Sequence, residues 1–154
     1  MGTLSAWIPV NFQGDSLRPT LVPGDRLLVK KTQSDTKHKR GDIVFFRDPR
    51  NSSGALVIKR IVGLPGESIR ASRSVYVNGQ LLNAPYLLDE IDLFDSSARG
   101  VNRIEDTSYF VMGDNRLAST DSRDFGVINA SVILGTAVLR YLPIARFSKL
   151  RSYH

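Results

Sequence analysis

The chain has 154 residues, 42% of them hydrophobic and 23% charged, which supports one domain with a real core and excludes a globally disordered chain. Its net charge of +6 is compatible with nucleic acid or anionic lipid but demands neither. The absence of cysteine excludes disulfides, thiol nucleophiles and cysteine-based metal sites. No stretch approaches the roughly 18–20 apolar residues of a membrane-spanning helix, and the N-terminus lacks the basic and apolar segments of a signal peptide.

Short apolar runs separated by turn residues dominate the chain, and long helical periodicity is scarce, so the sequence predicts a mainly β fold. In chain order, the predicted strands are residues 26–30, 43–47, 56–62, 74–77, 80–82, 108–112 and 132–141. Residues 129–133 are predicted to begin with a short helical turn, and Gly135 is predicted to be a bulge in the last strand.

The clearest turn is Asn78-Gly79, because this dipeptide tolerates the positive φ angles of a tight hairpin turn. Residues 89–106 are irregular and polar, and are predicted to form a long excursion over the surface. The polar residues 113–123 are predicted to form a loop.

The main concentration of charge is the basic run Lys37-His38-Lys39-Arg40, which follows Lys30 and Lys31 by a few residues. A solvated loop is the expected structure, and contact with an anionic membrane surface is the functional alternative. No aromatic residue interrupts the run, which argues against binding of single-stranded nucleic acid.

Ser16 is the first candidate for chemistry, because it lies in the turn-like segment Gly14-Asp15-Ser16-Leu17-Arg18-Pro19. A serine hydroxyl is a weak nucleophile that needs a neighbouring base and hydrogen-bond donors for the developing oxyanion. A turn can expose the hydroxyl and leave the backbone N–H free, but this segment alone favours an ordinary surface serine.

Lys59 is the second candidate, because it lies inside the apolar strand predicted at 56–62. Strand alternation puts Val57, Lys59 and Ile61 on one face and Arg60 on the other, so at least one cation should be partly desolvated. Burial lowers the pKa of a lysine and yields a neutral amine that accepts a proton. The alternative is an edge strand whose two cations reach solvent.

The loop 113–123 is the third candidate, because its polar residues are dense and directly follow an apolar strand. Asp121 and Arg123 are spaced to pair across the turn. Ser119 and Ser122 are placed to orient a neighbouring amine.

Together, these segments resemble the sequence boxes of the bacterial type I signal peptidase family. Residues 14–21 are similar to its nucleophile box, 40–44 to the following strand box, 59–67 to its general-base box and 109–123 to its last box. Val77-Asn78-Gly79 followed by 84–87 is similar to the hairpin that links them. The four boxes occur in the family's order, and the resemblance covers roughly residues 9–142.

The resemblance implies a coiled antiparallel β-sheet catalytic core in a single domain over 1–154, with a small inserted subdomain at about 68–107. It implies that Ser16 attacks the scissile carbonyl, that Lys59 is the general base, and that the Ser16 backbone N–H binds the oxyanion. Ser119 would orient the Lys59 amine, and Asp121 and Arg123 would hold the loop that carries it.

Two residues depart from the family pattern. Gly14 stands where many members have a serine that also binds the oxyanion, which leaves the second oxyanion donor open. Leu17 stands where many have methionine, and is expected to shape the pocket for the small substrate residue. Members usually carry membrane-spanning helices before the nucleophile box, so this chain is expected to be a piece cut after its anchor.

The implied substrates are exported preproteins with small residues at the first and third positions before the cut, processed on the outer face of the cytoplasmic membrane. A membrane surface is therefore an expected partner, and Trp7, Ile8 and Phe12 would lie near lipid or serve as ordinary packing. The only histidines, His38 and His154, are not placed for a Ser-His-Asp triad. No residue cluster has metal-ligand spacing, and no cofactor or nucleic-acid partner is expected.

Two other functions remain open from the sequence. A self-cleaving repressor-type protease also uses serine and lysine, but usually carries a DNA-binding segment that is not evident here. A non-catalytic β-rich peptide-binding module would fit the departures at Gly14 and Leu17.

Overall fold

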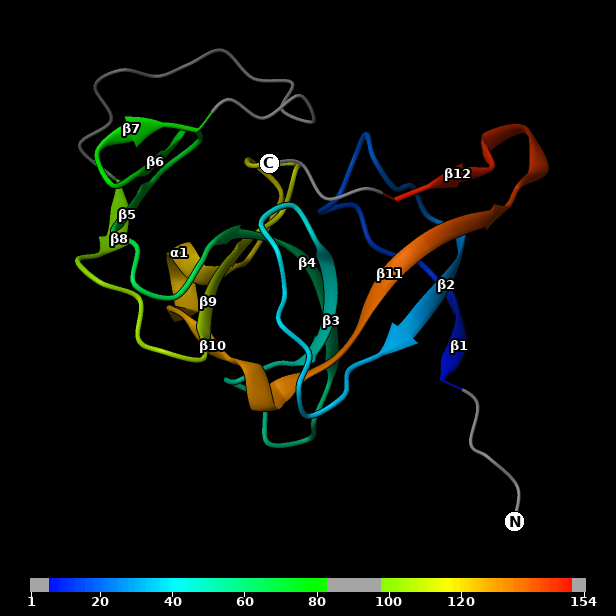
Figure 1. Cartoon of the computed structure of the whole chain (residues 1–154). Helices are drawn as coiled ribbons and strands as arrows, with labels where there is room; N and C mark the ends of the chain where they lie inside the picture. The colour runs from blue at the N-terminus through cyan, green and yellow to red at the C-terminus, as the bar shows by residue number, and fades with distance from the viewer. Residues whose placement is uncertain (1–5, 83–97, 151–154) are drawn as a thin grey trace.

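A computed structural model describes residues 6–82 and 98–150, and it confirms the mainly β fold class. Seven strands form one antiparallel path in the order β1-β2-β11-β3-β4-β9-β10, and β12 pairs with β11 (Figure 1). These strands are β1 (Trp7–Asn11), β2 (Arg26–Lys31), β3 (Ile43–Arg47), β4 (Leu56–Gly63), β9 (Ser108–Met112), β10 (Ile128–Asn129), β11 (Ile133–Leu142) and β12 (Ser148–Lys149). β1 was not predicted; it contains Pro9, which an edge strand tolerates because one side of its backbone needs no hydrogen bonds.

A smaller sheet lies in the chain between β4 and β9. Its order is β7-β6-β5-β8, formed by β5 (Ile69–Ala71), β6 (Val75–Val77), β7 (Gln80–Leu81) and β8 (Arg99–Val101). The predicted hairpin turn joins β6 to β7, with positive φ at both Asn78 (50°) and Gly79 (80°). β8 replaces part of the predicted surface excursion, whereas residues 84–87 and 89–97 lie outside the described residues.

The two faces of the large sheet bury different apolar clusters because strand residues alternate in direction. Ile58, Ile43, Val29 and Ala137 belong to one cluster, which also contains Phe12, Leu17 and Leu21 from the N-terminal segment. Val57, Val44, Phe46 and Ile61 belong to the opposite cluster. A third cluster joins the two sheets, because β5 and β6 contribute to it together with Val62, Phe110 and Met112.

The last long strand follows its prediction closely. β11 begins at Ile133 after a short 3₁₀ turn at Ala130–Val132, and its pairing with β3 shifts register between Ile133 and Gly135. A side chain at Gly135 would come within 2.6 Å of Val29 Cγ1 and 2.8 Å of the Lys30 carbonyl oxygen, so only glycine fits this approach to β2.

The solvated-loop prediction for the basic run is wrong at two of its four residues. His38 is only 6% exposed, and its ring meets the Tyr109 ring edge-on at a centroid distance of 5.5 Å. Burial lowers the pKa of the His38 imidazole, although Asp42 partly opposes this. Arg40 forms a two-pronged ion pair with Glu67 at 2.8 and 2.6 Å. The run alternates inward and outward residues because it leads directly into β3.

The predicted loop 113–123 ends in a short helix, α1 (Ser122–Phe125), that begins one residue after its N-cap Asp121. A second 3₁₀ turn, η2 (Ile144–Arg146), connects β11 to β12. Within residues 6–82 and 98–150, no helix is long and apolar enough to cross a membrane.

Candidate active site

Lys59 lies in the middle of β4 and is 6% exposed. Its partner on β3 is Val44, which is fully buried. On the other side of β4, Arg60 pairs with Met112 of β9, so the antiparallel register places Lys59 opposite Gly113, the first residue after β9. The predicted desolvation of a cation in this strand is therefore confirmed, and it applies to both Lys59 and Arg60.

Gly113 is the point at which the three candidate segments meet. A side-chain carbon at Gly113 would lie 2.3 Å from Ser119 Oγ and 2.6 Å from the Ser16 carbonyl oxygen. Both atoms thus approach the same backbone position, which faces Lys59 across the strand pair. The pairing of β4 with β9 brings Arg60 next to Met112, and the hydrogen bond from the Asn115 N–H to the Ser16 carbonyl adds the nucleophile segment.

Asn115 fixes the nucleophile segment to the loop after β9. Its backbone N–H donates to the Ser16 carbonyl at 3.0 Å, and its side-chain amide donates to the Asp15 carbonyl at 3.3 Å. Ser16 itself is half-buried. Sequence reasoning placed Asn115 in the last box but gave it no role, because hydrogen bonds to distant carbonyl groups leave no local pattern.

Asp121 organises the loop that carries Ser119. Its carboxylate accepts hydrogen bonds from Ser119 Oγ at 2.8 Å and from the Gly113 N–H at 3.0 Å. Arg123 donates through Nε and Nη2, each at 2.9 Å, so the predicted pairing of Asp121 with Arg123 is present. Burial raises the pKa of Asp121, but the hydrogen bonds and charge of Arg123 outweigh this and hold it below its usual range.

The electrostatic environment of Lys59 favours the neutral amine. Burial lowers the pKa of Lys59 and is the largest cause; the Asp121 carboxylate raises it, and the cations Arg123 and Arg50 lower it. Within residues 6–82 and 98–150, the Lys59 amine and the Ser16 hydroxyl make no hydrogen bond. Both groups are therefore available, and catalytic hydrogen bonds often close only around a bound substrate.

Leu17, the residue after Ser16, is fully buried in the apolar cluster with Phe12 and Ile58. It anchors the nucleophile segment against β4. A larger or smaller side chain at this position would therefore change a substrate pocket indirectly, by shifting the packed segment. Of the N-terminal apolar residues, Phe12 is buried, Ile8 is half-buried and Trp7 is 43% exposed.

A buried ion pair that sequence reasoning missed lies next to the site. Arg60 donates to both oxygens of Asp114, at 2.8 and 2.7 Å, and each side chain is 1% exposed. Thr20 Oγ1 donates to the same carboxylate at 2.7 Å. The pair thus links β4, the loop after Gly113 and the segment after Ser16. The sequence indicated it only through Arg60, the second cation in the apolar strand.

Replacing Gly113 with alanine is expected to lower kcat/KM by about a hundredfold or more, since small displacements at a reacting centre have such effects. The added carbon would meet Ser119 and the Ser16 carbonyl, so both would have to move. The matched control is Gly79→Ala, which is strained by a φ of +80° but contacts nothing within 4 Å. Steady-state kinetics of both variants measure the effect. Equal losses of activity in the two variants would contradict a positional role for Gly113.

Comparisons with known proteins identify the family of this chain. Residues 2–142 match the family model described as signal peptidase, peptidase S26. Signal peptidase I of Bacillus caldolyticus is 34% identical, with 96% of this chain and 87% of that protein covered. Signal peptidase I P of Bacillus subtilis subsp. natto is 37% identical over 90% of this chain and 78% of that protein.

The crystal structure of a signal peptidase I from Enterococcus faecalis V583 superposes with a TM-score of 0.55 at 32% identity, covering 67% of this chain and 98% of that one. The family match over residues 2–142 includes all the candidate segments described above. The chain therefore belongs to the signal peptidase family, peptidase S26.

Proposed function

We propose that this member of the signal peptidase family removes signal peptides from exported preproteins with Ser16 as nucleophile and Lys59 as general base. The observation that supports the pair best is the buried Lys59, whose pKa is lowered and which faces Gly113, where Ser16 and Ser119 also converge. A neutral amine in that position is the base that a serine nucleophile requires.

The proposed reaction proceeds by acyl transfer. The Ser16 hydroxyl attacks the scissile carbonyl while the neutral Lys59 amine accepts its proton, and the Ser16 backbone N–H stabilises the oxyanion. The protonated amine then donates its proton to the leaving amino group, which leaves the signal peptide esterified to Ser16. Lys59 next accepts a proton from a water molecule that attacks this ester, and the signal peptide is released from Ser16. Ser119 would orient the Lys59 amine, and Asp121 and Arg123 would hold Ser119 in place through the 2.8 Å hydrogen bond and the ion pair.

The first half of β4 is the proposed edge for substrate binding. β9 pairs with β4 only from Arg60 onward. Among the described residues, Leu56–Ile58 therefore pairs with β3 on one side and with no strand on the other. An extended peptide can add to such an edge with its backbone and leave its small side chains to define specificity. Leu56, at the start of this edge, is 57% exposed. We infer one catalytic domain that holds this edge, with the smaller sheet as an insertion.

The rate of cleavage is expected to rise with pH along one ionisation whose pKa lies below the usual lysine value. The rate rises with pH because only neutral Lys59 is a base. Burial lowers the pKa of Lys59, so the active form appears at a lower pH than for an exposed lysine. Arg50 also lowers this pKa, so Arg50→Ala should move the acidic limb of kcat/KM to higher pH. Arg47→Ala, an exposed change at the end of β3, is the control.

Cleavage of a preprotein in trans, combined with labelling of Ser16 by an acylating serine inhibitor, tests the proposal against its alternatives. A self-cleaving protease would not turn over a separate preprotein efficiently, and a binding module would not be labelled. A pH profile unaffected by Arg50→Ala, together with an acidic limb near the ordinary histidine pKa of about 6.5, would argue against lysine as the base.

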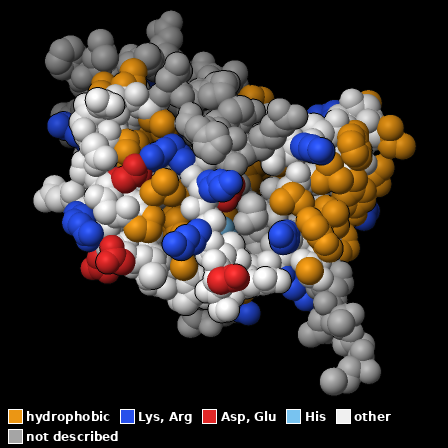
Figure 2. Space-filling view, in the orientation of Figure 1, with side chains coloured by type: hydrophobic (Ala, Val, Ile, Leu, Met, Phe, Trp, Pro, Cys, Tyr) orange, Lys and Arg blue, Asp and Glu red, His pale blue; other side chains and the backbone are white. Residues whose placement is uncertain are grey.

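We further propose that the chain works at the outer face of the cytoplasmic membrane, as its family is membrane-associated. Figure 2 shows hydrophobic side chains gathered over the β11–β12 side of the molecule. Ile144 is 79% exposed and Phe147 is 60% exposed at the turn between these strands, and Leu142 is 37% exposed. An apolar projection of this kind fits the interface of a bilayer better than free solvent.

A further inference from the structure

Arg140 of β11 joins the C-terminal hairpin to the segment that carries Ser16. Its Nη1 donates to the Thr20 carbonyl at 2.6 Å, and Thr20 lies four residues after Ser16 in the sequence. Figure 1 shows the β11–β12 end of the large sheet beside the loop that connects β1 to β2 and contains both residues. The reaction proposed above gives Arg140 no role.

The other contacts of Arg140 tie it to the hairpin itself. Nε donates to the Arg146 carbonyl at 2.6 Å, and Nη2 donates to Ser148 Oγ at 3.0 Å. Arg146 belongs to the 3₁₀ turn η2 and Ser148 to β12, so one guanidinium binds both the turn and the returning strand. Because a guanidinium presents its donors in fixed directions, these bonds determine where the Thr20 carbonyl is held.

Neutralising a carboxylate is a minor part of the role of Arg140. The nearby Asp25 is buried, and its closer cation is Arg146, at 2.8 Å against 3.5 Å for Arg140. Burial lowers the pKa of Arg140, as does the charge of Arg146, whereas Asp25 raises it. The shortest contacts of Arg140 are instead with two backbone carbonyl groups, and charge-assisted bonds of this kind are strong enough to fix a backbone.

Thr20 is held from a second direction as well. Its Oγ1 donates to the buried carboxylate of Asp114 at 2.7 Å. The chain before it forms a turn that is closed by the hydrogen bond from the Leu21 N–H to the Leu17 carbonyl at 2.9 Å. Both leucine side chains are fully buried, and Ser16 directly precedes the turn. A closely packed turn transmits a displacement from one end to the other, so a shift at Thr20 would move Ser16.

We propose that Arg140 is a positioning residue for the nucleophile: it carries the placement of the β11–β12 turn to Thr20 and thereby sets the position of the Ser16 hydroxyl. This inference rests on the proposed role of Ser16. Displacements of about 1 Å at a reacting centre can lower a rate about a hundredfold, so loss of the Thr20 contact should slow the chemical step.

The test measures single-turnover cleavage of a preprotein, with the rate divided by the fraction of enzyme that an acylating serine inhibitor labels at completion. Arg140→Ala should lower this rate by about a hundredfold. Arg140→Lys should lower it by about tenfold, because an ammonium group cannot reproduce the fixed donor directions of a guanidinium. Millimolar methylguanidinium should restore part of the rate of Arg140→Ala and leave the wild-type rate unchanged.

Substrate binding and the pH profile should not change in either variant. The proposed substrate edge, Leu56–Ile58, lies on β4, and the charges that act on Lys59 are those of Asp121, Arg123 and Arg50. KM should therefore stay within about twofold of wild type, and the acidic limb of kcat/KM should stay at the same pH, because only the chemical step is affected. A movement of that limb would assign Arg140 to the environment of Lys59 and contradict the proposal.

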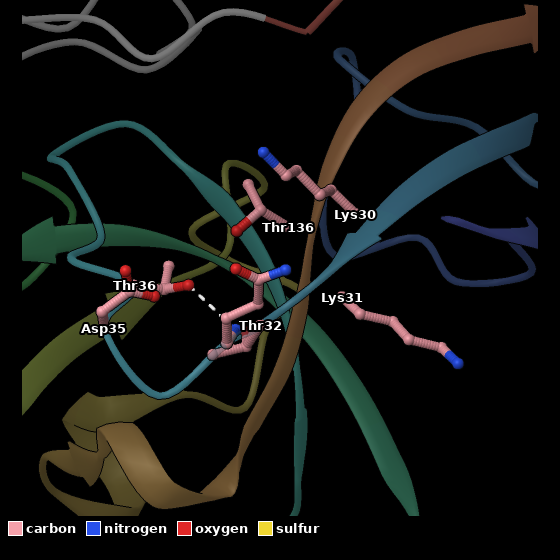
Figure 3. A pocket seen from close by; sticks show the side chains of 7 residues that line it. Lys30, Lys31, Thr32, Asp35, Thr36 and Thr136 are labelled. Carbon is pink, nitrogen blue, oxygen red and sulfur yellow. Dashed lines mark hydrogen bonds between the residues drawn. The ribbon is translucent and has the colours of Figure 1, made fainter. Parts of the chain in front are cut away.

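Two matched controls separate position from charge. Arg26→Ala removes an exposed arginine that follows Asp25 directly and pairs with Leu142 of β11. Lys30→Gln removes an exposed cation at the opposite end of the same strand pair, where Figure 3 shows Lys30 beside Thr136. Both variants should cleave at the wild-type rate per labelled site.

A merely structural role for Arg140 would lower the labelled fraction and the unfolding temperature but leave the rate per labelled site at the wild-type value. That result, or an equal loss of rate in Arg26→Ala, would overturn the proposal. Arg140→Lys keeps the charge beside Asp25, so it provides the decisive measurement if Arg140→Ala does not fold. Failure of the peptidase assignment is distinct, since the wild-type protein itself would then neither cleave the preprotein nor become labelled.

Discussion

Alanine at Ser16 and methionine at Lys59 are each expected to lower kcat by about four to six orders of magnitude, the range found when one member of a catalytic unit is removed. Ser16→Ala deletes the attacking oxygen. Lys59→Met keeps the length and apolar stem of the side chain but deletes the amine, so the buried site remains filled. The measurement is single-turnover cleavage of a preprotein with excess enzyme.

The double variant should be no slower than either single variant, since the two groups act as one unit. Ser53→Ala and Lys149→Met, both at exposed positions, are the controls and should retain full activity. Both active-site variants should unfold at the wild-type temperature within a few degrees. Turnover in either variant above one per cent of wild type would refute the Ser16–Lys59 pair, whereas loss of folding would be visible in the unfolding measurement.

The second large effect concerns stability. Asp114→Ala should lower the free energy of unfolding by about 3–5 kcal/mol, because it leaves the Arg60 guanidinium buried without its carboxylate. The loss should also release Thr20, which lies in the segment after Ser16, so cleavage should fall even at temperatures where the variant is folded. Urea denaturation monitored by the fluorescence of Trp7 and by circular dichroism measures the first effect.

The matched control for this ion pair is Asp106→Ala. Asp106 pairs with Arg103 at 3.4 Å, but their side chains are 85% and 63% exposed. Loss of an exposed pair costs about 0–1 kcal/mol because solvent already screens it. The combined variant Arg60→Met with Asp114→Leu should recover much of the lost stability, since neither charge is then buried alone. Equal effects of Asp114→Ala and Asp106→Ala would show that burial of the Arg60–Asp114 pair is unimportant.

Features that depend on neighbouring residues could be predicted from the sequence. The strands at 43–47 and 108–112 have the predicted bounds, because alternating or continuous apolar runs are a local property of the chain. The Asn78-Gly79 turn followed from the φ angles that these two residues tolerate. The family was recognisable because its boxes occur in order along the chain, and the family comparison confirmed it.

Features that depend on distant partners required the tertiary structure. His38 and Lys39 are adjacent and both basic types, yet only His38 is buried, because the Tyr109 ring lies over it. Strand alternation predicted desolvation for Lys59 or Arg60 without deciding which cation is ion-paired. In the structure, the carboxylate of Asp114 pairs with Arg60, and none pairs with Lys59 among the described residues.

The sequence by itself therefore determined most of the longer strands, the tight turn, the family and the candidate serine and lysine. Only the tertiary structure decided which of the two adjacent cations is ion-paired, and that Ser119 and the Ser16 carbonyl approach Gly113, which follows the β9 residue paired with Arg60. The physical reason is that charge, desolvation and steric fit at a buried point are set by residues distant in the sequence. Arg60 and Asp114, for example, are 54 positions apart and meet only when β4 and β9 pair.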